Sequence, residues 1–141
     1  MSPVIRGILG IIVGIALATF MIAGVEYLAY VLFPPPAGLD PRNAADMPQI
    51  LAQAPVAAFL VVGLAWALGA FVGGWGAARI ARRAPDTHIA IITALVLAGA
   101  IWNMLRLPHP AWFWVVAIVL ILLGAVGARR MARTRDVPSA A

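Results

Sequence analysis

The sequence predicts an all-α membrane protein whose four transmembrane helices form an antiparallel bundle. Four stretches without a charged residue make up more than half of the 141-residue chain, at residues 7–25, 54–78, 89–105 and 110–128. A helix rises about 1.5 Å per residue, so roughly 20 apolar residues cross a hydrocarbon core of about 30 Å. The composition agrees, because 64% of the residues are hydrophobic and 11% are charged, against roughly 45–50% and 25% in soluble proteins.

The first span is predicted at about residues 4–33. It ends before Pro34, the first of three consecutive prolines, because proline cannot donate the helical hydrogen bond and clashes with the preceding turn. An external loop over residues 34–49 follows. Asp40 and Asp46 resemble helix N-caps, since a proline follows each within two residues. We therefore expect one or two short interfacial helices in this loop, leading into the second span.

The other three spans are joined by short turns that contain proline. We predict them at about residues 50–82, 88–107 and 111–131. An aromatic cluster at residues 112–114 opens the last span, where amphipathic rings favour the outer membrane interface. The single transmembrane domain covers residues 1–135, and residues 136–141 are expected to be a disordered tail.

The cytoplasmic ends of the second and fourth spans resemble each other. Residues 73–82 and 124–133 are identical at six of ten positions. If this similarity reflects an internal repeat, the chain consists of two tandem helical hairpins related by a pseudo-two-fold axis along the membrane normal. The alternative is that Gly, Ala and Arg are simply common where spans end.

The arginines predict the orientation of the chain. Four spans bring eight of the ten basic residues to one side, namely Arg6, Arg79, Arg82, Arg83, Arg129, Arg130, Arg133 and Arg135. The positive-inside rule then places both termini in the cytoplasm. Because basic segments also attract anionic lipids, by about 1 kcal/mol per arginine, membrane lipids are the predicted partners and nucleic acid is not.

Glu26 is the main candidate for a functional side chain, because it is the only acidic residue inside a predicted span. A carboxylate at this depth is costly unless it is protonated, paired or hydrated, so it should face protein or a cavity. Thr19 and Tyr30 lie on the same face of the helix at 100° per residue. With Asn103 and Arg106 at the outer end of the third span, Glu26 and Tyr30 form the predicted intramembrane polar cluster.

Two interpretations of Glu26 remain open. In the first, Arg106 pairs with Glu26 and Asn103 adds a hydrogen bond, which holds two helices together. In the second, the carboxylate exchanges a proton or binds a cation. The sequence has no cysteine and no His/Glu metal spacing or catalytic cluster, so we predict no enzyme, no cofactor and no metal site.

Glycines mark the faces suited to close helix packing. They are Gly7, Gly10 and Gly14 in the first span and Gly69 and Gly73 in the second. Small residues at such spacing let backbones approach closely in membranes. We expect them to pack helices within the chain or against a second copy, so the predicted partner is a homo-oligomer, with a dimer favoured, or a membrane complex of which the chain is a subunit.

Three stretches carry a family resemblance. Residues 26–40 (including Glu-Tyr-Leu and Phe-Pro-Pro-Pro-Ala-Gly-Leu-Asp), 66–81 and 107–113 (Leu-Pro-His-Pro-Ala-Trp-Phe) resemble a group of uncharacterised small bacterial inner-membrane proteins with four spans. The resemblance implies a bacterial inner-membrane location and nothing about chemistry. In architecture alone, the chain is similar to the small multidrug-resistance exporters, which are dimers with a membrane-embedded glutamate in their first span.

Two functional hypotheses follow. The leading one is a small polytopic inner-membrane protein without catalytic chemistry, acting by helix-mediated self-association or by association with a membrane complex or lipid. The alternative is a proton-coupled small-molecule or ion transporter, or a channel, that uses Glu26. A bond to Arg106 in a dry bundle would favour the first, whereas a cavity beside Glu26 would favour the second.

Overall fold

The computed structural model describes residues 2–133 and contains five helices. They are α1 (Pro3–Leu32), α2 (Met47–Gln53), α3 (Val56–Ala81), α4 (Pro85–Arg106) and α5 (Ala111–Arg133). All but α2 are long and apolar enough to cross a membrane. They pack together into one bundle, which confirms the predicted four-helix membrane fold.

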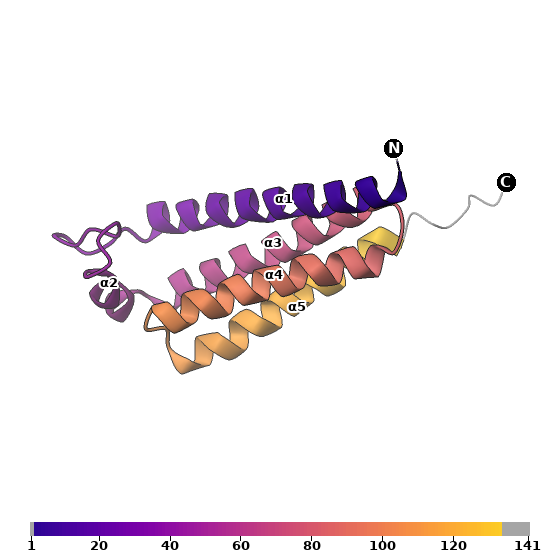
Figure 1. The fold of residues 1–141 in the computed structure, drawn as a ribbon. Coiled ribbons are helices and arrows are strands. Elements are labelled where there is room, and N and C mark those ends of the chain that lie inside the picture. Colours follow the sequence, from indigo (N-terminus) through magenta and orange to yellow (C-terminus); the bar gives the residue numbers. More distant parts are fainter. Residues whose placement is uncertain (1, 134–141) are drawn as a thin grey trace.

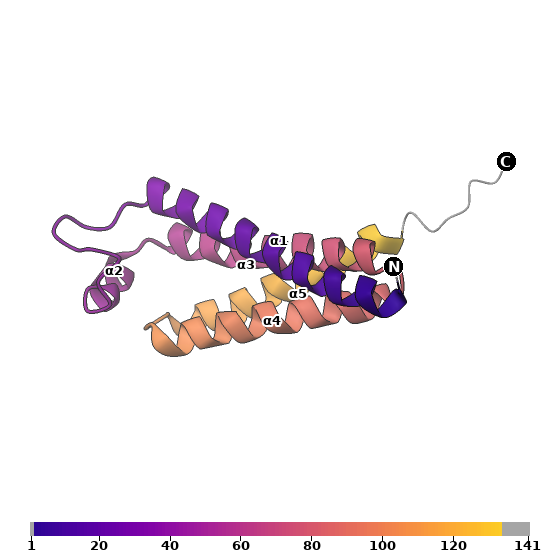
Figure 2. The same ribbon diagram turned by 45° about the horizontal axis from the view of Figure 1, so that its top comes forward.

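Helix α3 lies at the centre of the bundle. It contacts α1, α4 and α5, whereas no contact between α1 and α5 occurs among the described residues. Figures 1 and 2 both show α1 lying against α3, and α2 with its preceding loop beyond one end of the bundle. We call that end the loop end. The opposite end, where the N-terminus and the end of α5 lie (Figure 1), is the basic end.

Glycines bring α1 and α3 into close contact. A Cβ atom built on Gly73 would lie 2.6 Å from the carbonyl oxygen of Gly14 and 2.8 Å from the Cβ of Ala18. A Cβ on Gly10 would likewise lie 2.7 Å from the carbonyl oxygen of Ala77. Because side chains are missing at these positions, the two backbones touch directly, as small-residue packing in membranes requires.

Proline sets the start of each later helix. We expected the second span to begin near residue 50, and that boundary was wrong. Helix α2 ends at Gln53 and α3 begins only at Val56, because Pro55 between them is extended, with φ −69° and ψ 154°. Proline removes a backbone donor and disfavours helix in the residue before it, so the two helices cannot be continuous.

The two similar segments end their helices at the same end of the bundle but pack differently. Helices α3 and α5 both run from the loop end to the basic end (Figure 1). Gly73 faces α1, whereas a Cβ on its counterpart Gly124 would meet the backbone of Ala67 in α3. The predicted tail at residues 136–141, and Arg135, lie outside the described residues.

Candidate functional site

A cavity of about 420 Å³ lies between α1 and α4, with α3 behind it. Isoleucine, leucine, valine, alanine and glycine form most of its wall. The polar contributions come from Thr19 and Glu26 on α1, Trp66 on α3 and Asn103 on α4. The cavity is therefore a partly open, mainly apolar pocket between the spans that contains a single acidic group.

Glu26 accepts a hydrogen bond from an indole. The Nε1–H of Trp66 donates to its Oε1 over 3.0 Å. Trp66 is only 4% exposed and its ring packs 5.6 Å from that of Phe113, so the donor is held in place by the core. The helix contact explains the register, since Ile22 fills the space beside Gly69 and the next turn brings Glu26 to Trp66.

The predicted polar cluster is only partly assembled. Asn103 lines the same cavity as Glu26. Tyr30 does not line it, and its side chain is 49% exposed. The guanidinium of Arg106 lies 4.4 Å from the centre of the Trp102 ring, a cation–π contact on the outer surface of α4.

The interpretation that paired Glu26 with Arg106 does not describe this structure. Trp66 supplies the bond to the carboxylate, and the guanidinium of Arg106 lies instead over the exposed ring of Trp102, one turn earlier on α4. Long basic side chains near helix ends turn outward in this way because their charge then reaches water. Within residues 2–133, no basic side chain pairs with Glu26.

Trp66 is the site residue that the sequence analysis missed. A buried tryptophan usually finds an acceptor for its ring N–H, and an unpaired carboxylate inside a span needs a donor. Those two requirements together were the available signal. They could not be joined from sequence, because nothing there sets the rotation of α1 against α3.

The carboxyl group of Glu26 accepts one hydrogen bond and has capacity for more. One oxygen is held by Trp66, and no second donor among the described residues reaches the group. A cation or a hydrogen-bond donor entering the cavity would find apolar walls for its body and the carboxyl group for its polar end. This is the usual composition of a small-molecule site, in which a few placed polar groups orient a mainly apolar ligand.

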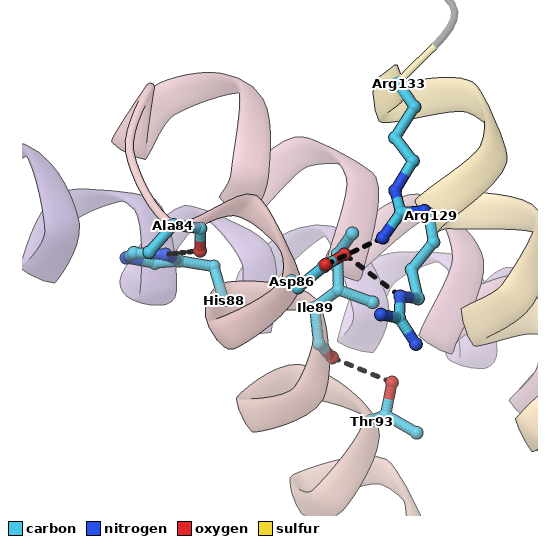
Figure 3. A network of polar contacts seen from close by, with 7 residues as sticks. All are labelled: Ala84, Asp86, His88, Ile89, Thr93, Arg129 and Arg133. Atoms are coloured by element: carbon cyan, nitrogen blue, oxygen red, sulfur yellow. Dashed lines mark hydrogen bonds and ion pairs between the residues drawn. The ribbon is translucent and has the colours of Figure 1, made fainter.

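A second polar network lies at the basic end. Asp86 accepts hydrogen bonds from Arg129 and Arg133, both over 2.9 Å, and Figure 3 shows the two arginines reaching it from α5. Nearby on α4, Thr93 donates to the carbonyl oxygen of Ile89 over 2.8 Å. Since both ion pairs are exposed to solvent, we expect them to contribute little to stability.

Histidines and carboxylates do not gather anywhere in the described part of the chain. No group of three or more metal-ligating side chains occurs within residues 2–133. His109 lies in the turn before α5, where its Nδ1–H donates to the carbonyl oxygen of Leu107 over 3.0 Å and its ring stacks on Phe113. Burial lowers the pKa of His109, although the bond to Leu107 opposes that shift.

The chain matches no protein-family model, no curated protein and no solved structure. A function must therefore be argued from the geometry of the site.

Proposed function

We propose that this membrane protein binds a small hydrophobic cation, or a proton in its place, in the cavity between α1 and α4. In this proposal Glu26 is the exchangeable group of a proton-coupled transporter, and the protein has no catalytic activity. One observation supports it above the others: Glu26, the only acidic side chain in the interior of a span among residues 2–133, faces a cavity of about 420 Å³ and has no basic partner there.

The chemistry of exchange follows from the surroundings of the carboxylate. An unpaired negative charge in a mainly apolar pocket is costly, so it is relieved either by a proton or by a cation. The two then compete for one carboxyl group, and binding of one releases the other. The bond from Trp66 keeps the group oriented toward the cavity in both states.

The test is cation binding and flux with the reconstituted protein. Tetraphenylphosphonium is the probe, since it is apolar and permanently charged. We expect Glu26→Gln to abolish saturable binding in detergent and proton-driven flux in liposomes. Tyr30→Phe is the matched control, because it removes a polar group one turn away that does not line the cavity.

Two results would contradict the proposal. Flux that survives in Glu26→Gln would show that the carboxylate takes no part. An equal loss in Arg106→Gln would show that the arginine acts with Glu26, although the structure places it on Trp102.

We also propose that the protein lies in a bacterial inner membrane with its basic end in the cytoplasm. The grouping of seven described arginines at that end supports this orientation through the positive-inside rule. Cysteines introduced at Ala37 in the loop and at Ala84 at the basic end, both exposed, would report this orientation. A membrane-impermeant thiol reagent applied to intact cells should label only the first.

Self-association is the second candidate function, because α1 is the least buried of the four spans. The free faces of α1 could pack against a second copy or a membrane complex, but Gly10, Gly14, Gly69 and Gly73 are already used inside the chain. Cross-linking through cysteine at Phe20, an exposed position on α1, would detect such a dimer. A strictly monomeric protein in lipid would remove this candidate.

A further inference from the structure

The basic end has more positive charge than its carboxylate can neutralise. Among residues 2–133 it contains seven arginines and one acidic residue, Asp86. Asp86 lies on the side where α4 meets α5, and there it binds Arg129 and Arg133 (Figure 3). No second carboxylate lies at this end within the described part of the chain, so the other arginines there have no acidic partner.

A cavity of about 370 Å³ lies at the basic end, between the end of α3, the start of α4 and α5. Arg79 and Arg82 line it from the end of α3, Pro85 lines it from the start of α4, and Ala132 lines it from α5. Because both arginines line this one cavity, their two guanidinium groups can reach the same ligand. Both side chains are exposed, and neither has a carboxylate partner among the described residues.

We propose that this cavity binds the phosphate of an anionic phospholipid. A guanidinium group offers paired N–H donors that match two phosphate oxygens, and two such groups favour a ligand with net negative charge. Their positive charge, with no acid to offset it, is complementary to such a headgroup.

The position of the cavity favours a lipid over a dissolved anion. Its walls include Ala78 and Ala132, which belong to membrane-spanning helices. The guanidinium of Arg79 also lies 5.9 Å from the centre of the Trp75 ring, and tryptophan favours the level of lipid headgroups. A phosphate bound here would therefore lie where the headgroups of the surrounding leaflet already are.

The test is a calorimetric titration of the full chain in detergent with short-chain phosphatidylglycerol. Each arginine near an anionic lipid contributes about 1 kcal/mol, so Arg79→Gln/Arg82→Gln should weaken binding about 30-fold, at 1.4 kcal/mol per tenfold. The matched control is Arg83→Gln/Arg130→Gln. It removes two charges from the same end but none from the cavity wall, and it should weaken binding much less.

Two ligand controls identify the source of the phosphate. Phosphatidylcholine should bind more weakly than phosphatidylglycerol, because its choline group offsets the charge. Inorganic phosphate should not displace the lipid at equal concentration. Displacement by inorganic phosphate would reveal a site for a dissolved anion, and equal binding of both lipids would show that charge is not recognised. Either result overturns the assignment.

The comparison of variants can also overturn it. Equal losses in the two double variants would mean that only the summed charge of the basic end matters. If the cavity variant does not fold, as judged by its helix content, Ala132→Leu provides the test, because it fills the cavity and keeps every arginine. We expect it to weaken the binding of phosphatidylglycerol. An unchanged affinity would show that the lipid does not bind in this cavity.

Discussion

The close contact of α1 with α3 predicts that one methyl group at Gly73 destabilises the bundle. The Cβ of Gly73→Ala would lie 2.6 Å from the carbonyl oxygen of Gly14, whereas real Cβ contacts stay beyond 3.0 Å. The helices must separate by at least the difference, 0.4 Å. A gap of roughly 0.5 Å forfeits about a quarter of each dispersion contact across the interface, and overpacking costs about 1–3 kcal/mol in well-packed cores.

Gly24→Ala is the matched control, since it is the same change on α1 with nothing within 4 Å of the new atom. It should stabilise the helix by up to about 1 kcal/mol, because alanine has the higher helix propensity. Unfolding in mixed detergent and SDS micelles, followed by helix content, measures both. We expect the two variants to shift the free energy of unfolding in opposite directions. If Gly73→Ala is as stable as Gly24→Ala, the backbones of α1 and α3 do not touch as described.

Two further predictions concern Trp66 and His109. Trp66→Phe removes the donor to Glu26. It should lower stability by about 0.5–1.5 kcal/mol, the usual net worth of a hydrogen bond, because in the proposed function Glu26 is protonated when no cation is bound. Trp102→Phe at an exposed position should have little effect in the same unfolding assay. Because burial lowers the pKa of His109 from its usual 6.5, stability should be constant above that pH and fall as the pH drops through the lowered pKa. His109→Gln should flatten this part of the unfolding profile between pH 8 and 5, and an unchanged slope would contradict the burial of the ring.

The fold could be predicted from sequence because charge-free runs and proline positions act locally. The runs place all four spans, and Pro34 stops α1 within two residues of the predicted end. The predicted start of α3 was wrong because the charge-free residues 47–78 contain two prolines, Pro48 and Pro55, and a helix can begin at either. Only the structure shows that each begins its own helix.

The site could be predicted only in part, because its members come from different helices. Glu26 stands out as an isolated charge in an apolar span, and Asn103 lies in the same cavity. Which residue reaches Glu26 depends on how α1 is rotated, and the glycine contact with α3 determines that rotation. The contact turns Glu26 toward Trp66, and Arg106 is left at the outer end of α4.

The cavity itself follows from how tightly α1 is held by α3. Glycines draw α1 onto α3, and the residues that remain between α1 and α4 are too small to close the gap, notably Ala18, Gly99 and Ala100. A Cβ on Gly99 would meet nothing within 4 Å, so Gly99→Leu should fold without strain and partly fill the cavity. If the cavity binds the cation, this variant should lose tetraphenylphosphonium binding while it keeps Glu26, Trp66 and its full stability.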